Sequence, residues 1–187
     1  METMVLSIRQ IMTDEEFFYF CQENPDHTFE REPDGRITVM PNTGGKTGRL
    51  NFKIGGHFFN WNEKAQLGEA FDSSTAFRLP DRSTRSPDVA WVSREHWDRL
   101  TEREQEQFPP LCPDFVIELR SATDSLSITK KKMTDVWMAN GCRLAWLIDP
   151  STETTHIFRA NGEIQIVSFD KSLSGEEVLP GFELKMG

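Results

Sequence analysis

The sequence predicts a mixed α/β fold, and three features support this prediction. Short apolar runs rich in β-branched and aromatic residues, typical of buried strands, occur at 86–92, 113–121 and 144–148. Stretches with helical spacing lie between such runs, and a hairpin follows them. At 187 residues the chain is long enough to bury a substantial core, and we expect one domain over residues 1–187.

The N-terminal part is expected to contribute two helices and four strands. Thr13 and Glu16 form a capping box that opens a helix ending near 24–25. A second helix over 47–65 follows a glycine-rich loop at 42–48. Gly55-Gly56 weakens the prediction of this helix, although close packing at these positions would explain the pair. The expected strands are 28–31, 36–40, 69–72 and 75–79.

The C-terminal part is expected to add short polar helices, one longer helix and the hairpin. Thr101 and Glu104 form a second capping box, which predicts one or two short helices within 94–107. Ser125 or Ser127 can cap a helix that reaches Asn140, where a following glycine suits the helix end. The hairpin and tail are expected as strands at 155–158 and 164–169, a turn at 161–162, and an apolar contact over 179–182.

Composition excludes several classes of protein. The 14 Phe and 5 Trp argue against disorder, and no run approaches the roughly 20 apolar residues of a membrane helix. No signal peptide is evident, and three widely spaced cysteines suit a reducing cytoplasm. The net charge of −9 argues against a constitutive, high-affinity nucleic-acid binder. Basic residues can still cluster locally, as around Arg78, Arg82 and Arg85 or over 130–132.

Two of the predicted strands carry a carboxylate, Asp88 and Glu118. An acid in an apolar run is costly to bury unless it is paired, protonated or bound to a cation. Carboxylate oxygens suit Mg²⁺, which usually takes one or two of them with water and substrate phosphate. The pair therefore indicates a metal site. Other interpretations stay open: Asp88 as a turn residue after Pro87, and Glu118 either on an edge strand or as an ion-pair partner of Arg120 or Arg143.

Lys132 is the lysine that best fits such a site. On the expected helix it shares a ridge with Ile128 and Val136, so its stem should lean toward the apolar side. A lysine there can orient the attacking water and offset charge that develops on the phosphorane. The alternative interpretation is a solvated charged helix face, which is how we interpret Lys130 and Lys131.

A nucleotide-binding loop is a weaker interpretation of Gly44-Gly45-Lys46-Thr47. The phosphate-binding template requires a glycine five positions before Gly45, and Met40 stands there. A glycine-rich connection is the better prediction for this segment.

Several motifs in order resemble one known family. They are SPDVAWVS, LCPDFVIELRS, a helix with KM, then NG and LAWLIDP, together with DGRITVMPNTGGKTGRLN, WNE, FDSSTAFRLPDRSTRSPD and SLSGEEVLPGF. Together they span nearly the whole chain. This combination resembles the Uma-type restriction endonuclease family of the PD-(D/E)XK, or restriction-endonuclease-like, superfamily.

The resemblance implies a fold and a set of site residues. The implied fold is a central mixed β-sheet flanked by helices, with extra N-terminal and C-terminal strands, and the implied metal-binding acids are Asp88 and Glu118. The superfamily usually places a lysine two residues after the second acid, where this chain has Arg120. Families of this type move that lysine to the next helix, and Lys132 of the KM pair fits. A third metal-binding acid is expected from the N-terminal part, with Glu30 preferred to Glu63.

Two arginines are assigned to substrate binding. Arg120 cannot give up a proton and is a poor base, but it can contact a phosphate. Arg85 belongs to the basic group before the first acid.

The leading hypothesis is a cytoplasmic, Mg²⁺- or Mn²⁺-dependent endonuclease that hydrolyses DNA. The alternative is a non-catalytic binding or scaffolding protein on the same fold, which the acidic net charge and the missing strand lysine favour. A nucleotide hydrolase ranks third. The sequence leaves the oligomeric state open, and an exposed sheet edge and the tail are compatible with a homodimer.

Overall fold

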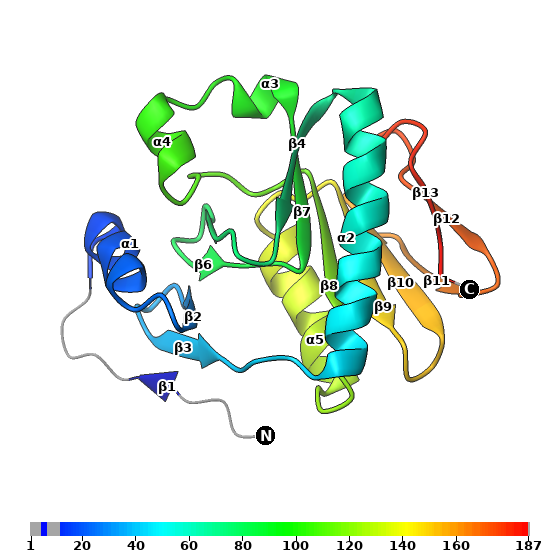
Figure 1. Ribbon diagram of the computed structural model, residues 1–187, viewed down its shortest axis with the longest axis horizontal. Coiled ribbons are helices and arrows are strands. Elements are labelled where there is room, and N and C mark those ends of the chain that lie inside the picture. Colours follow the sequence, from blue (N-terminus) through cyan, green and yellow to red (C-terminus); the bar gives the residue numbers. More distant parts are fainter. Residues whose placement is uncertain (1–4, 7–11, 187) are drawn as a thin grey trace.

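A six-stranded mixed sheet forms the centre of the computed structural model, which describes residues 5–6 and 12–186 (Figure 1). The strand order is β11-β10-β9-β8-β7-β4. β8 and β9 pair in parallel, and the other neighbouring strands pair antiparallel. The strands are β4 (Gly68–Asp72), β7 (Val89–Ser93), β8 (Phe115–Leu119), β9 (Leu144–Asp149), β10 (Thr154–Arg159) and β11 (Ile164–Ser168). The predicted fold class is confirmed.

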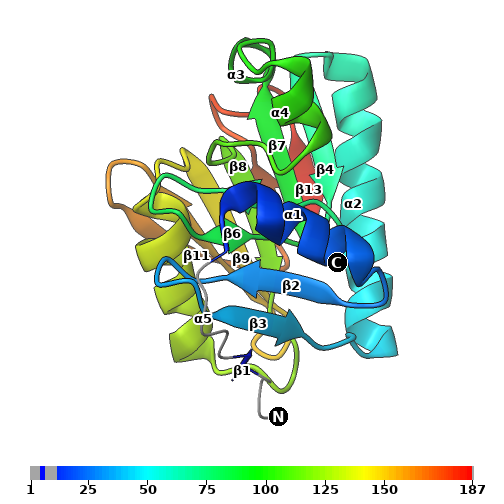
Figure 2. The same cartoon turned by 90° about the vertical axis from the view of Figure 1, so that its left-hand side faces the viewer.

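Helices cover both faces of this sheet (Figures 1 and 2). Helix α2 (Gly45–Ala65) lies on one face, and α5 (Leu126–Lys132) with the π-helical segment η1 (Met133–Met138) lies on the other. Because side chains alternate along a strand, each face receives every second residue. Phe115 and Ile117 of β8 join the apolar cluster of Ile54 from α2, whereas Val116 packs in the cluster of Trp137 from η1.

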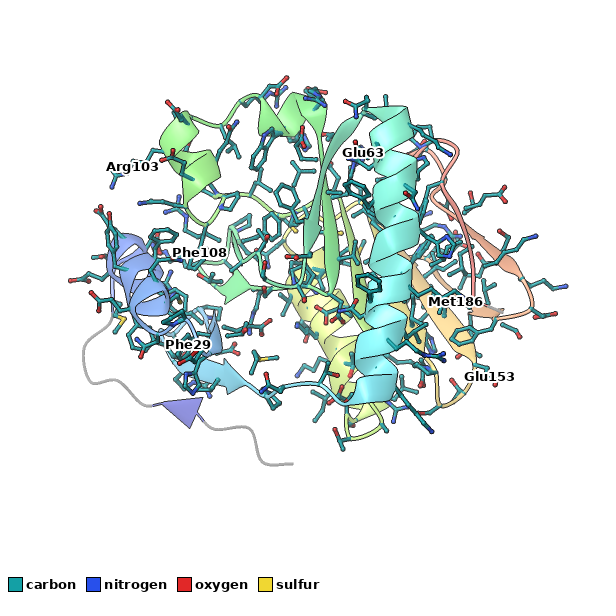
Figure 3. The ribbon with its side chains drawn as sticks, in the orientation of Figure 1. Phe29, Glu63, Arg103, Phe108, Glu153 and Met186 are labelled. Carbon is teal, nitrogen blue, oxygen red and sulfur yellow. The ribbon has the colours of Figure 1, made fainter. Side chains whose placement is uncertain are left out.

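A second, smaller sheet lies beside the central one rather than continuing it (Figure 2). Its strands, in spatial order, are β1 (Val5–Leu6), β3 (Ile37–Met40), β2 (Thr28–Arg31), β6 (Thr84–Arg85) and β5 (Phe77–Arg78). Helix α1 (Asp14–Glu23) covers it, and Phe17, Phe29 and Ile37 form a separate core on which Phe108 packs (Figure 3).

The C-terminal residues form a ribbon on the α2 face. Strands β12 (Ser172–Ser174) and β13 (Glu183–Lys185) pair with each other. Leu179 and Phe182, between these strands, are buried in the same cluster as α2. The apolar contact predicted for the tail is therefore confirmed, and so are the extra strands at both ends of the chain.

Helix starts follow the predicted capping residues. Thr13 caps α1 and Thr101 caps α4 (Glu102–Glu106), each with a complete capping box. A further short helix, α3 (Arg94–Trp97), precedes α4, so two short helices occupy the region predicted for one or two. No described helix is long and apolar enough to cross a membrane.

Three features differ from the sequence prediction. Strand β6 was not expected, because two residues carry no periodicity. The helix expected to reach Asn140 changes to π winding at Met133, where Ala139 N donates to Thr134 O. The expectation of close packing at Gly55-Gly56 is wrong, since a Cβ at either glycine would meet nothing within 4 Å.

Candidate active site

The two strand-borne acids lie opposite each other on neighbouring strands. β7 and β8 are antiparallel with Val89 opposite Ile117, and this register continues to Asp88 opposite Glu118. Alternation puts both acids on the sheet face that α5 and η1 cover. The fold thus brings together the pair that the sequence singled out.

Glu118 is buried, and one of its oxygens carries its described contacts. Oε1 accepts a hydrogen bond from Trp137 Nε1 at 2.8 Å and lies 2.9 Å from Lys132 Nζ. No described residue donates to Oε2, so that oxygen keeps its lone pairs for another ligand. Neither Arg120 nor Arg143 pairs with Glu118, because each has an aspartate partner of its own.

Asp88 is held by one backbone group and one side chain. Leu119 N donates to Oδ2 at 2.6 Å, and Asn51 Nδ2 of α2 donates to Oδ1 at 3.2 Å. The first contact ties Asp88 to β8, and the second ties it to the helix on the other face. These two contacts hold the Asp88 carboxylate in the site, so Asp88 does more than occupy a turn after Pro87.

Glu30 reaches the site from the small sheet. Its Oε1 lies 3.2 Å from Lys132 Nζ and accepts from Ser86 N at 3.2 Å, while Oε2 accepts from Arg85 Nη1 at 3.1 Å. Arg85 also forms a bidentate pair with Glu32. Of the three acids in the site, Glu30 is the one that contacts two cationic side chains.

Lys132 joins the two sheets, since its ammonium group contacts both Glu118 and Glu30. The expected ridge is only partly present, because Ile128 is 72% exposed. The π winding supplies a better reason for the geometry. In an α-helix, residues five apart point roughly 140° away from each other, whereas i→i+5 winding brings them to one side. Lys132 and Trp137 are five apart, and both contact Oε1 of Glu118.

A cavity of about 790 Å³ opens onto this cluster. Its floor includes Asp88, Glu118 and Lys132, and Glu30 lies behind the lysine, outside the lining. One wall is 39–47, the segment that enters α2, and another is 121–124, the loop after β8. The cavity gives a substrate direct access to the two acids.

Burial and charge shift the protonation of these groups. Burial, with the nearby Asp88 and Glu30 carboxylates, raises the pKa of Glu118 to about 7 despite the Lys132 charge. Burial likewise raises the pKa of Asp88, against the hydrogen bond from Leu119. Burial opposes ionisation of Glu30, but Lys132 and Arg85 outweigh it and hold its pKa below the usual range.

The same contacts act on the lysine. Burial disfavours its charge, yet Glu118 and Glu30 raise the pKa of Lys132 well above its ordinary value. Lys132 therefore stays protonated. Burial disfavours the ionised forms of Asp88 and Glu118, and a cation bound between them would stabilise those forms.

The donor set suits an oxygen-preferring ion held by two carboxylates. Among residues 5–6 and 12–186, no group of three or more His, Cys, Asp or Glu side chains is placed to hold a metal ion. Asp88 and Glu118 remain as a pair, with one free carboxylate oxygen on Glu118. Mg²⁺ and Mn²⁺ commonly accept such a pair and complete their shell with water and phosphate. Glu30 as a third metal ligand stays a prediction.

The other predicted residues lie as follows. Arg120 donates to both oxygens of the buried Asp149 and to Asp124 O, and Arg85 is held by Glu30 and Glu32. Their role in substrate binding stays a prediction. Glu63 lies near the opposite end of α2 from the cavity (Figure 3).

Sequence reasoning missed two residues that touch the acids. Trp137 had no signal beyond its apolar character, because its contact depends on the π winding. Asn51 occupies a helix position next to the apolar ridge, and a polar residue on an inward face was the available signal.

A mixed sheet with acids on adjacent strands and a lysine from the following helix defines the class: this is a restriction-endonuclease-like fold. The chain belongs to the Uma2 family, described as "Putative restriction endonuclease", whose profile matches residues 14–187. The resemblance stated from the sequence is confirmed.

A solved structure shares the fold. The crystal structure of a protein described as a putative nuclease belonging to DUF820, from Anabaena variabilis, aligns with a TM-score of 0.73. The two chains are 21% identical, and the alignment covers 93% of this chain and 94% of the other. No curated protein matches this sequence.

Proposed function

We propose that this protein is a divalent-metal-dependent nuclease that hydrolyses DNA phosphodiester bonds at the cavity above Asp88 and Glu118. The observation that carries the proposal is the convergence of two opposed carboxylates, the buried Glu118 and the partly buried Asp88, with one lysine at the floor of an open cavity. Membership of a family described as restriction endonucleases supports the same activity.

Asp88 and Glu118 would hold the ion, with Mg²⁺ or Mn²⁺ as the expected metal. When bound, the ion would polarise the phosphodiester and lower the pKa of a coordinated water. Asp88 is positioned for this by Leu119 N and Asn51, and Glu118 by Trp137. These fixed donors keep the carboxylates in place before any ligand arrives, which is the arrangement that a reactive site requires.

Lys132 acts as a cation and not as a base, because its neighbours keep it protonated. An ammonium group beside Glu118 can donate to a water or to a phosphate oxygen. It can also offset the negative charge that builds on the phosphorane.

The three free cysteines, Cys21, Cys112 and Cys142, support a reducing, cytoplasmic location.

The proposal is tested with purified protein, Mn²⁺ or Mg²⁺, and supercoiled, linear and single-stranded DNA. Wild-type protein should cleave at least one of these substrates. Asp88→Asn should lose cleavage and Mn²⁺ binding together, and Lys132→Met should lose cleavage while still binding Mn²⁺ in calorimetry. Lys131→Met is the matched control, because Lys131 is exposed on the same helix.

Stability measurements separate chemistry from folding. Replacing the partly buried Asp88 carboxylate with an amide removes a desolvation cost, so Asp88→Asn should unfold at the same or a higher temperature. Wild-type protein that leaves every substrate intact and binds no Mn²⁺ would overturn the proposal in favour of a non-catalytic role.

A further inference from the structure

Positive charge is concentrated in one segment of this acidic chain. Residues 35–62 contain no Asp or Glu, although the whole chain has 30 acids and a net charge of −9. The same segment contains Arg36, Lys46, Arg49 and Lys53. Three of these cations lie on α2, the helix whose beginning forms a wall of the candidate active-site cavity.

The three cations share one exposed face of α2. Lys46, Arg49 and Lys53 are three and four positions apart, a spacing that places side chains in one row on a helix. All three are exposed, and none forms an ion pair with a described residue. Most other arginines in the described chain form an ion pair with Asp or Glu, whereas Arg49 forms none with a described residue. The row spans about 10 Å along the helix axis, enough to meet two or three successive phosphates of one strand.

The row is fixed relative to the acids. Lys46 itself lines the cavity, and Asn51, on the inward side of the same helix, donates to Asp88. A strand bound along these cations therefore runs directly into the cavity that contains Asp88 and Glu118.

An exposed aromatic ring lies within this basic stretch. Phe52 is 85% exposed, more than any other large apolar side chain described. A Cβ at Gly56, one turn further on, would meet nothing within 4 Å, so the helix surface next to Phe52 is open there. An aromatic ring beside unpaired cations is the pattern of proteins that bind single-stranded nucleic acid, in which cations hold phosphates and rings stack on bases.

We propose that the outer face of α2 binds the DNA strand that enters the cavity, with Lys46, Arg49 and Lys53 on its phosphates and Phe52 stacked on an unpaired base. The proposal rests on the proposed nuclease function and identifies the substrate as DNA with an unpaired stretch next to the cleaved bond. It also explains how a chain of net charge −9 can bind DNA, since the acids are absent from the surface that meets it.

Binding is measured separately from cleavage. Fluorescence anisotropy with labelled 20-nucleotide single strands and duplexes in EDTA, over a series of salt concentrations, reports affinity without hydrolysis. The variants are the triple K46A/R49A/K53A and the single F52A. Lys64→Ala, an exposed lysine about 16 Å further along α2, is the charge control. Phe59→Ala, 57% exposed on the same helix, is the aromatic control.

The triple variant should reduce the slope of log K against log salt by about 2 for single strands, since each lost phosphate contact removes roughly 0.7. Phe52→Ala should weaken single-strand binding roughly 5- to 150-fold and leave duplex binding nearly unchanged. Lys64→Ala and Phe59→Ala should bind like wild type.

Two results would overturn this assignment. One is a triple variant that binds no more weakly than Lys64→Ala. The other is Phe52→Ala and Phe59→Ala both lowering the mass in sedimentation while DNA binding is unchanged, which would make this face a contact with a second copy of the chain. Binding is measured in EDTA, so its result is independent of the cleavage assay. If the protein cleaves DNA but the α2 variants bind DNA like wild type, only this inference is wrong. If the α2 variants lose DNA binding but wild type cleaves nothing, only the proposed function is wrong.

Discussion

Trp137 donates its indole N–H to Oε1 of Glu118 at 2.8 Å, and both side chains are buried. The ring is fully enclosed, and Lys132 Nζ lies 5.9 Å from its centre. One residue thus touches both the central acid and the lysine that neutralises it.

The indole N–H should matter for stability. Trp137→Phe keeps most of the apolar surface but removes a buried donor to a carboxylate, which should lower the free energy of unfolding by about 1–3 kcal/mol. Urea denaturation measures this. Trp61→Phe is the control, because its indole donates to Pro180 O at an exposed position and should cost less. Equal losses in the two variants would contradict the assigned role of the Glu118 contact.

The five-residue spacing between Lys132 and Trp137 across η1 should be required for activity. Inserting one alanine after Thr134 would put these two residues six positions apart and rotate Trp137 by about 100° away from Lys132. Cleavage should fall about 100-fold or more, the usual result of a misplaced site, while the far-ultraviolet circular dichroism spectrum is retained. Thr134→Ala keeps the chain length and should remain active. An active insertion variant would show that the two residues need not converge.

Metal affinity should depend on pH through Glu118. A carboxyl whose pKa is about 7 is largely protonated at pH 5.5, and a metal must displace that proton. The affinity for Mn²⁺ should therefore rise by about 30-fold from pH 5.5 to pH 8 and level off above pH 7. Calorimetry over this range measures it. Glu118→Gln should bind weakly with little pH dependence, and a pH-independent wild type would argue against Glu118 as a ligand.

Arg120 should be needed for stability. It donates to both oxygens of Asp149, which is fully buried, so Arg120→Leu leaves an uncompensated buried charge. The expected loss is about 3–5 kcal/mol in urea denaturation. Asp149→Asn in the same chain should recover part of this loss. If Arg120→Leu remains stable but binds DNA more weakly, the predicted phosphate contact is the better assignment.

Local patterns explain why much of the site could be predicted from the sequence. Asp88 and Glu118 stand out because an acid inside an apolar run is costly, and that cost is visible in a few residues. The helix starts at Thr13 and Thr101 were also predictable, because a capping box is visible within four consecutive residues. Lys132 was found through helical spacing, although the exposed Ile128 shows that the spacing argument was incomplete.

The parts that escaped prediction depend on contacts between distant segments. Strand β6 contains only two residues and exists because β2 and β5 offer it partners. The π winding changes which residues share a side of the helix, and the hydrophobic periodicity of the sequence does not indicate it. The exposed face of α2 was visible in composition as a stretch without acids, but its place beside the cavity required the fold.

The contact between Glu30 and Lys132 also sets the order in which the site can assemble. These residues are 102 positions apart, and closing so long a loop is slow and comes late compared with helix or hairpin formation. During synthesis both strand acids and Glu30 leave the ribosome before the lysine and tryptophan that complete the cluster. A nascent chain therefore carries its acids without Lys132 until the end of α5 has emerged, and the site becomes competent only after the segment through Trp137 has been made.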